Sequence, residues 1–330
     1  MHKLDFLVPT YNEGEGVVKP LLDSLALQLA IDFDDIGVII CCDGGDTVIT
    51  DDLMSQYPFH TEFHMLGHKG ISATRNACQD FSSAEYVSFI DCDDRLASVF
   101  GVYTLMREIK SKEFDVMISV FYEQTKDPNG DFQIVPHGLD ESVFVHGRVY
   151  RRQYLIDNDI RFPTTALAHE DSCHTITAQA LADPDRVLLN SFPWHAWCWR
   201  ESSVCRSDPL YIKKTYIQMI ASSETLVDGF IKRMRDDLAE RYICSLVEDT
   251  YYTLLSKSWR DNINAEYREM TEKRFAEYLR KHIARWNATP NEVKLAISNG
   301  VRQRHVMEGD MMLEDITIED WLARIQRKYG

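Results

Sequence analysis

The chain has 330 residues, of which 45% are hydrophobic, and carries a formal net charge of −16 at pH 7. This length and composition allow one sizeable folded domain together with an appendage. The acidic balance argues against broad, non-specific attraction to nucleic acid or to anionic lipid. The sequence contains no run of about 18 apolar residues, so we expect no transmembrane segment.

The cysteines and the first residues give an expectation about location. Eight cysteines are scattered along the sequence without a metal-type Cys-x-x-Cys pair, which favours reduced thiols. Residues 1–5 lack the apolar core of a signal peptide and lead directly into a predicted strand. We therefore expect a cytoplasmic protein.

Strand-like runs and helical periodicities alternate through the first hundred residues. Residues 4–8 predict a strand, and apolar residues then recur at helical spacing over residues 17–29. A second strand is predicted at residues 36–42, a helix beginning within residues 68–77, and a further buried strand at residues 86–90. This alternation is typical of a doubly wound α/β sheet, in which ligands bind beyond the carboxyl ends of the strands.

Three carboxylates stand at the end of the strand predicted at residues 86–90. Asp91, Asp93 and Asp94 follow it directly, and side chains two apart on an extended backbone point the same way. Carboxylates held close together in a partly buried site favour a divalent cation such as Mg²⁺ or Mn²⁺, which commonly bridges to nucleotide phosphates. A solvated turn is the usual interpretation of an isolated Asp-x-Asp, but the polar segments at the other strand ends favour a site here.

Eight segments along the chain carry the polar and aromatic side chains of this pattern. They are Pro9-Thr10-Tyr11-Asn12-Glu13, Asp43-Gly44-Gly45-Asp46, Gly70 to Ala77, Asp91-Cys92-Asp93-Asp94, Gly147 to Arg152, Asn158 to Pro163, His169-Glu170-Asp171 and Trp199 to Val204. In this order they resemble the successive motifs of family-2 glycosyltransferases, and several motifs in a fixed order are far more specific than one alone. The resemblance covers roughly the first two-thirds of the chain. It implies a GT-A fold, an α/β doubly wound mixed sheet, here with a helical C-terminal appendage.

The resemblance implies a nucleotide-diphosphate sugar as donor, with a UDP-sugar favoured. The base would lie near Pro9, Tyr11 and Asp43, with Tyr11 bordering the base and Asp43 accepting a hydrogen bond from it; plain packing over the strand end is the alternative for Tyr11. Glu13 would contact the ribose or cap the following helix. Cys42 stands where the family usually has a second acidic residue, so the base preference stays open.

Two further segments are assigned to the diphosphate by the resemblance. Arg75 would lie toward it, the alternative being an exposed surface pair with Asp80. Trp199, Arg200 and Ser203 resemble a closing loop in which the Trp and Arg cover the diphosphate and exclude water.

The same resemblance gives the three aspartates at the end of this strand different roles. Asp91 would reach the ribose, Asp93 would ligate Mn²⁺ or Mg²⁺, and Asp94 is an additional metal-ligand candidate. His195 is a candidate for a third metal ligand, since some GT-A enzymes use a histidine further along the sequence. Its aromatic surroundings favour a hydrogen-bonded core histidine equally well.

The acceptor hydroxyl needs a base within hydrogen-bond reach. By resemblance this base is Asp171, with Glu170 orienting it or contacting the acceptor, and attack opposite the leaving group would invert the anomeric configuration. The alternative is that the two acids only cap a helix over residues 172–181. His169 and His174 are secondary candidates for acceptor contacts.

The prediction for the acceptor names one class and one alternative. We expect a surface polysaccharide or lipid-linked glycan, with a hydroxymethylated base in viral DNA as a nucleic acid alternative that the acidic balance disfavours. Four aromatic residues would suit stacking on a sugar or a base, namely Tyr150, Trp194, Trp197 and Trp199.

Two other classes of protein use the same kind of fold. A nucleotidyltransferase would need a basic, Gly-rich loop after the first strand, and residues 9–16 contain no Lys or Arg. A non-catalytic nucleotide-sugar-binding protein would tolerate the loss of Asp93 or of the Glu170-Asp171 pair, and all three are present.

We expect a catalytic domain over residues 1–205, with the donor nucleotide and metal half at 1–100 and the acceptor half at 101–205. Residues 206–330 are rich in predicted helix, and residues 287–290 predict a break between two helices. This region would shape the acceptor site or mediate a homodimer through its helices. Its apolar stripes, which predict packing surfaces, include Ile212, Tyr216, Met219, Ile220, Leu246, Tyr251, Leu254 and Leu255.

Overall fold

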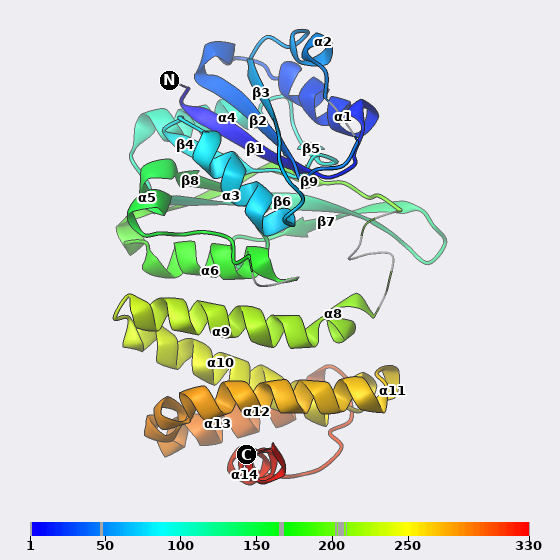
Figure 1. Cartoon of the computed structure of the whole chain (residues 1–330), viewed down its shortest axis with the longest axis vertical. Coiled ribbons are helices and arrows are strands. Elements are labelled where there is room, and N and C mark those ends of the chain that lie inside the picture. The colour runs from blue at the N-terminus through cyan, green and yellow to red at the C-terminus, as the bar shows by residue number, and fades with distance from the viewer. Residues whose placement is uncertain are drawn as a thin grey trace. The chain divides into compact units, whose positions relative to one another are not determined.

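The structure is a computed structural model that describes residues 2–46, 49–164, 168–201, 203, 208 and 210–329. The chain divides into two compact units, Met1–Glu201 and Ser202–Gly330. Figure 1 shows the first unit as a sheet with helices and the second as helices alone.

The first unit is built around one mixed sheet, which among the described residues has nine strands. Their order is β3-β2-β1-β4-β8-β6-β9-β5, with β7 paired to β6. Strands β1, β2, β3 and β4 are parallel, whereas β8 runs antiparallel to both β4 and β6. The strands are β1 (Leu4–Thr10), β2 (Ile36–Cys42), β3 (His60–Met65), β4 (Tyr86–Phe89), β5 (Arg95–Leu96), β6 (Val116–Lys126), β7 (Phe132–His137), β8 (Arg148–Arg151) and β9 (Val187–Trp197).

Helices cover both faces of the sheet, which is why every position of β1 and β2 is buried and most of them are apolar. On one face α1 (Glu15–Ala26) and α4 (Gly101–Ser111) pack into a core that includes Leu22, Leu105 and Trp194. The opposite core receives α3 (Ile71–Phe81), α5 (Arg152–Asp157) and α6 (Glu170–Leu181), through residues such as Cys78, Leu155 and Ala178. The short helices of this unit are α2 (Asp51–Met54), η1 (Phe33–Asp35) and η2 (Pro184–Arg186).

The strand directions bring distant polar segments to one edge of the sheet. Because β1, β2 and β4 are parallel, residues 9–13, 43–46 and 91–94 follow strands that end at the same edge. Strand β8 is antiparallel to β4 and to β6, and β9 is parallel to β6, so β9 also ends there. Residues 198–200 therefore join the other three segments, and the doubly wound mixed sheet expected from the sequence is confirmed.

The second unit is helical throughout its described residues. Tyr216 and Ile220 are buried as their stripe predicted, but Ile212 is 72% exposed because it lies on the short preceding helix. The predicted break is confirmed, with one helix ending at Ala288 and the next starting after Pro290. The helices are α8 (Tyr211–Lys214), α9 (Tyr216–Lys232), α10 (Asp236–Leu255), α11 (Lys257–Asn262), α12 (Ala265–Ala288), α13 (Asn291–Met307) and α14 (Ile318–Tyr329).

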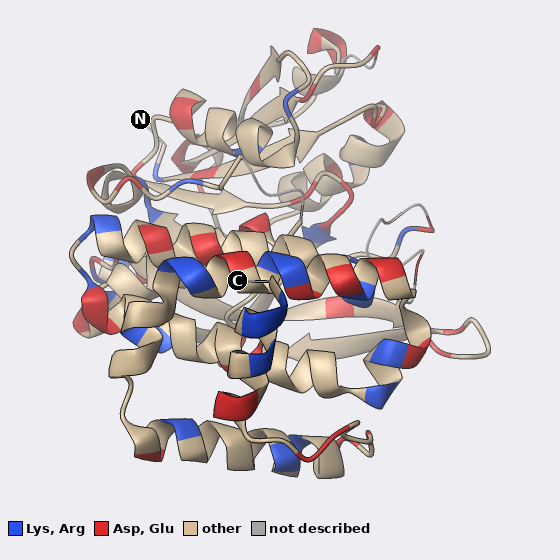
Figure 2. Ribbon diagram, turned by 60° about the horizontal axis from the view of Figure 1, so that its bottom comes forward, with Lys and Arg blue, Asp and Glu red and all other residues tan. Residues whose placement is uncertain are grey.

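Charge is distributed unevenly between the two units. Residues 1–201 contain 15 Lys and Arg against 32 Asp and Glu, whereas residues 202–330 contain 21 against 20. Figure 2 shows both signs alternating along the helices of the second unit. All of the net negative charge therefore belongs to the unit that holds the strand-end carboxylates. Within the described residues, no helix has the length and apolar character needed to cross a membrane.

Gly147, which precedes β8, packs closely against the backbone of β6 and allows a test of how much this contact stabilises the sheet. It has a φ of +68°, and a Cβ at this position would lie 2.8 Å from the backbone oxygen of Ser119. We predict that Gly147→Ala lowers the free energy of unfolding by about 1–3 kcal/mol, because the strained backbone and the fixed oxygen cannot both relax. Urea unfolding measures the change.

Gly16→Ala is the matched control, because Gly16 lies within α1 and an added Cβ there meets no atom within 4 Å. Its stability should stay equal to that of the wild type or rise by up to about 1 kcal/mol. Equal stabilities for the two variants would contradict the role given to Gly147.

Candidate active site

Arg75 of α3 lies at the centre of the cluster of charged residues at the strand ends. Its Nη2 donates to Asp91 Oδ1 at 3.0 Å, and its Nη1 donates to Glu170 Oε1 at 2.8 Å. Only 5% of the residue is exposed. One buried guanidinium thus joins the acidic turn after β4 to the first turn of α6.

The alternative of an exposed Arg75 paired with Asp80 is wrong, because Asp80 pairs instead with Arg161 at 2.6 Å. Burial would lower the pKa of Arg75, but the carboxylates of Asp91 and Glu170 outweigh burial and raise it. The effect is reciprocal at Asp91, whose pKa is lowered because the Arg75 charge outweighs the cost of burial. Both groups are therefore charged at neutral pH.

Asp171 follows Glu170 at the start of α6 and is half-buried. Burial, and then the charge of Glu170, raise the pKa of Asp171 to about 7, while Arg75 acts in the opposite direction. Its Oδ1 accepts the N–H of Ser172 at 2.8 Å. The side chain is thus held in place and balanced between its two protonation states near neutral pH, as a general base requires.

The histidines beside this acidic pair differ in exposure. His174 is fully buried and stacks on Phe162 with ring centroids 4.1 Å apart, so it belongs to the core and the expectation of an acceptor contact is wrong. Burial lowers the pKa of His174 to about 3, which keeps it neutral. His169 is partly exposed and directly precedes α6.

Asp93 lies on the side of the turn that faces α1. Its Oδ2 is 3.1 Å from Arg200 Nε, and Arg200 Nη1 is 3.2 Å from Glu13 Oε1. Burial, followed by the charges of Asp91 and Asp94, raises the pKa of Asp93 to about 6. Glu13 therefore pairs with Arg200. The alternative that Glu13 caps the following helix is wrong, because the N-cap of α1 is Gly14 and no side chain of the described residues bonds there. The contact of Glu13 with the ribose stays a prediction.

A pocket of about 270 Å³ opens beside Asp93 and Arg200. The backbone N–H of Trp199 donates to Gln124 Oε1 at 3.0 Å, which fixes the start of the predicted closing segment. Ser202 and Val204 of that segment lie outside the described residues. The pocket is lined by Gly16, Val17, Pro20, Asp93, Arg95, Gln124, Cys198, Trp199 and Arg200.

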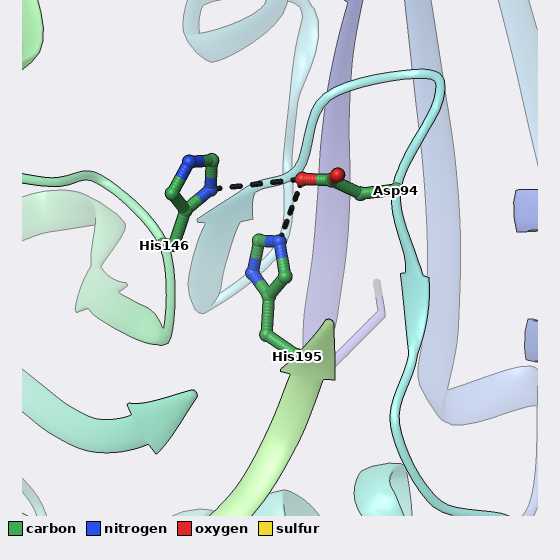
Figure 3. Close-up of side chains that lie close together, drawn as sticks. All are labelled: Asp94, His146 and His195. Carbon is green, nitrogen blue, oxygen red and sulfur yellow. Dashed lines mark hydrogen bonds and ion pairs between the residues drawn. The ribbon is translucent and has the colours of Figure 1, made fainter. Parts of the chain in front are cut away.

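Asp94 belongs to a buried group with two histidines, His146 and His195, drawn in Figure 3. His195 Nε2 lies 2.8 Å from Asp94 Oδ2, and His146 Nδ1 lies 3.6 Å from the same oxygen. Asp94 Oδ1 accepts the N–H of Cys198 at 2.9 Å. The N–H of Gly147 donates to His195 Nδ1 at 3.2 Å, so the His195 proton is on Nε2 and faces the carboxylate.

The structure therefore brings together Asp94 and His195, which the sequence had offered as metal ligands. Here His195 is a buried histidine hydrogen-bonded to Asp94, which is the alternative given for it in the sequence analysis. The ligand atoms of Asp94, His146 and His195 lie within 4.8 Å of one another, a spacing that suits either a hydrogen-bonded triad or a cation. His146 was not singled out in the sequence. Nothing in its neighbourhood signals a contact with Asp94, which is 52 residues away.

The predicted base-binding residues lie around the loop that follows β3. Asp43 accepts the N–H groups of Lys69 and Gly70 at 2.7 and 2.9 Å, so it organises this loop. Tyr11 is 46% exposed and stacks on His68 with ring centroids 4.8 Å apart. Pro9 is buried within β1. His68 is an addition to the sequence-based set.

The aromatic residues expected to stack on a sugar or base fall into two groups. Tyr150 and Trp194 are fully buried, so for them the expectation is wrong. Trp197 and Trp199 are half-buried near the end of β9. The apolar cores on the two sides of the sheet account for the difference, since Tyr150 belongs to one and Trp194 to the other.

Residues 5–175 match the family model described as "Glycosyl transferase family 2", and this match spans more than half of the chain. The chain belongs to glycosyl transferase family 2. The family expected from the sequence is thereby confirmed, as is the expectation of a glycosyltransferase. The matched range contains the strand-end motifs and the Glu170-Asp171 pair, and it ends before Trp199 and Arg200.

A curated relative is the poly(ribitol-phosphate) beta-glucosyltransferase of Bacillus spizizenii, which is 28% identical over 194 residues. That alignment covers 53% of this chain but only 29% of the relative. Among solved structures, S. aureus TarS 1-349 has a TM-score of 0.63 in its UDP complex and 0.64 in its UDP-GlcNAc complex, at 17% and 18% identity. Each covers 99% of this chain and 91% of the other. At this identity the likeness shows a shared fold.

The buried position of Arg75 leads to a stability prediction. We predict that Arg75→Met lowers the free energy of unfolding by about 3 kcal/mol at pH 8, because it leaves the carboxylates of Asp91 and Glu170 without their cation. At pH 5 the loss should be smaller, since protonation can then neutralise carboxylates in the cluster. Denaturant unfolding at the two pH values measures both effects.

Arg161→Met is the control, because Arg161 and its partner Asp80 are exposed. Removing this surface pair should change stability by less than about 1 kcal/mol. A loss in Arg75→Met as small as that of the control, or one independent of pH, would contradict the bridging role.

Proposed function

We propose that this glycosyltransferase moves a sugar from a nucleotide-diphosphate donor, preferably a UDP-sugar, to a hydroxyl of a surface polysaccharide or lipid-linked glycan. The bridge formed by Arg75 between Asp91 and Glu170 carries the proposal, because it brings the donor-side and acceptor-side carboxylates of the family motifs into one site. All of the residues involved belong to the first unit, which we take to be the catalytic unit.

Asp171 is the proposed base. It takes the proton from the acceptor hydroxyl as that oxygen attacks the anomeric carbon, on the face opposite the departing nucleotide diphosphate, so the configuration inverts. The raised pKa of Asp171, about 7, supports this role because the carboxylate can accept a proton and release it near neutral pH. Glu170 is held by Arg75 and orients the start of α6.

The carboxylates around Asp93 fit a divalent cation. The pKa of Asp93 is raised to about 6 by burial and by its acidic neighbours, which shows negative charge without full compensation. Asp93, together with Asp91, would hold the Mn²⁺ or Mg²⁺. Such an ion, when bound, offsets the charge that develops on the leaving nucleotide diphosphate. Asp94 and His195 are already hydrogen-bonded to each other, so we give them the role of supporting the turn.

Arg200 and Trp199 are proposed to close over the diphosphate. In this structure Arg200 lies between Asp93 and Glu13, at the edge of the pocket of about 270 Å³. A guanidinium in this place can pair with phosphate oxygens bidentately. Closing the site with Trp199 would exclude water and limit hydrolysis of the donor.

The donor and acceptor classes rest on different observations. The UDP and UDP-GlcNAc complexes of S. aureus TarS support a UDP-sugar donor on the shared fold. The name of the Bacillus spizizenii relative, a poly(ribitol-phosphate) beta-glucosyltransferase, supports a hydroxyl-bearing polymer as the class of acceptor, and the alignment covers 29% of that protein. The 32 acidic residues of the first unit, against 15 basic ones, disfavour the DNA-base alternative. The free cysteines among the described residues support a cytoplasmic location.

Metal-dependent donor binding tests the proposed function. We predict that UDP at ten times its dissociation constant stabilises the wild type by about 1.4 kcal/mol in the presence of Mn²⁺, seen as a rise in melting temperature. Asp93→Asn should lose this rise, and in the wild type the rise should diminish as the pH falls through about 6, because Asp93 is then protonated.

Asp52→Asn is the control, since Asp52 is exposed on α2 and belongs to none of the motifs. It should bind UDP as the wild type does. A wild-type response to UDP that is indifferent to Mn²⁺ and to Asp93 would contradict the metal-dependent reaction.

The base is tested by kinetics. We predict that Asp171→Asn lowers kcat by about 10²- to 10⁴-fold, because a general base contributes this much, while UDP binding with Mn²⁺ is retained. In the wild type the rate should fall about tenfold per pH unit below about 7, as Asp171 becomes protonated. A variant that keeps more than a tenth of the wild-type kcat would contradict the assignment.

A further inference from the structure

A half-buried indole stands beside a carboxylate at the end of β9. Trp197 lies opposite Glu123 of β6 in the parallel register of the two strands, so the two side chains project from the same face of the sheet. One face of the indole stacks on His146, with ring centroids 4.9 Å apart and planes at 28°, and Phe144 packs 5.2 Å away. The Trp197 ring is thus held rigidly next to an acidic group.

A second carboxylate and an imidazole complete this surface. His137 Nε2 lies 2.9 Å from Glu123 Oε2, and its Nδ1 lies 3.7 Å from Glu141 Oε2. All three side chains are 18% exposed, so each reaches the surface with part of its atoms. We call Trp197, Glu123, His137 and Glu141 the Trp197 platform.

The Trp197 platform adjoins the acidic strand end through two buried histidines. His195 pairs with Phe121 and Trp197 with Glu123 in a regular stretch of β9, so the side chains of His195 and Trp197 project from the same side of that strand. His195 Nε2 in turn lies 2.8 Å from Asp94 Oδ2. His146, under the indole, also approaches Asp94 at 3.6 Å, which connects the platform to the acidic turn (Figure 3).

An aromatic ring beside carboxylates has a definite chemical preference. The flat C–H face of a sugar ring packs on an indole, and its hydroxyls donate charge-assisted hydrogen bonds to carboxylate oxygens. A phosphate at the same place would be repelled by the neighbouring carboxylates of Glu123 and Glu141. The surface therefore selects a neutral, hydroxyl-rich group over an anionic one.

We propose that the Trp197 platform binds a neutral sugar unit of the acceptor. The inference rests on the proposed function, because it names the acceptor chemistry of that same active site. It assigns the stacking surface to Trp197 and the recognition of hydroxyls to Glu123 and Glu141, with His137 holding the two carboxylates in place.

A glycan array tests the assignment without knowledge of the natural acceptor. The full chain, with UDP and Mn²⁺ present, is applied to neutral glycans and to the same glycans bearing phosphate. We expect the wild type to bind neutral glycans and to bind their phosphorylated forms more weakly. Trp197→Ala and Glu123→Gln should each lower the apparent affinity about tenfold, and Trp197→Phe should restore most of what Trp197→Ala loses.

Phe132→Ala is the matched aromatic control. Phe132 is 59% exposed on the same hairpin, but it pairs with Lys126, three residues from Glu123, and so belongs to the opposite face. Asp52→Asn is the control for loss of an acidic charge. Both should bind glycans within twofold of the wild type.

Three results would overturn the assignment: no neutral glycan is bound by the wild type, phosphorylated glycans are preferred, or Trp197→Ala and Glu123→Gln bind within twofold of the wild type. UDP binding with Mn²⁺, measured on the same samples, keeps the two proposals apart. Loss of UDP binding in the wild type counts against the proposed function, whereas the glycan results judge the platform.

Discussion

The site depends on one shared positive charge. Arg75 is buried between Asp91 and Glu170, so a single guanidinium compensates carboxylates that come from the end of β4 and from the start of α6. Removing a cation from such a group leaves buried charges unpaired, which costs far more than losing a surface ion pair. The geometry that brings the proposed donor and acceptor sides together is therefore also a condition for the stability of the folded unit.

In the proposed reaction, the negative charge that Arg75 does not compensate has two uses. Arg75 compensates Asp91 and Glu170, but the pKa values of Asp93 and Asp171 stay raised, at about 6 and about 7. Each of these two carboxylates is thereby suited to bind a positive partner, a cation at Asp93 and a proton at Asp171. Burial raises the pKa of Asp94 as well, but Asp94 does not share this role, because His195 and the N–H of Cys198 bond to its two oxygens.

Local patterns in the sequence were sufficient for much of the fold. The apolar run at residues 36–42 predicted a strand, and the carboxylates after residue 90 predicted the polar end of another. Both predictions succeed because a strand is recognised from residues that are neighbours in the sequence. The contacts of Arg75 with Glu170 and of His195 with Asp94 span 95 and 101 residues. Such contacts depend on the order and direction of strands in the sheet, which local periodicity does not encode. His68, stacked on Tyr11, was missed for the same reason.

The most direct test of the shared charge is a titration of the Asp171 carboxyl by carbon-13 NMR, in the wild type and in Arg75→Met. The account predicts a pKa of about 7 for Asp171 in the wild type. In the variant this pKa should be higher still, because Arg75 stabilises the charged carboxylate. An Asp171 that titrates near 4, its ordinary range, and that does not respond to Arg75→Met would contradict the account.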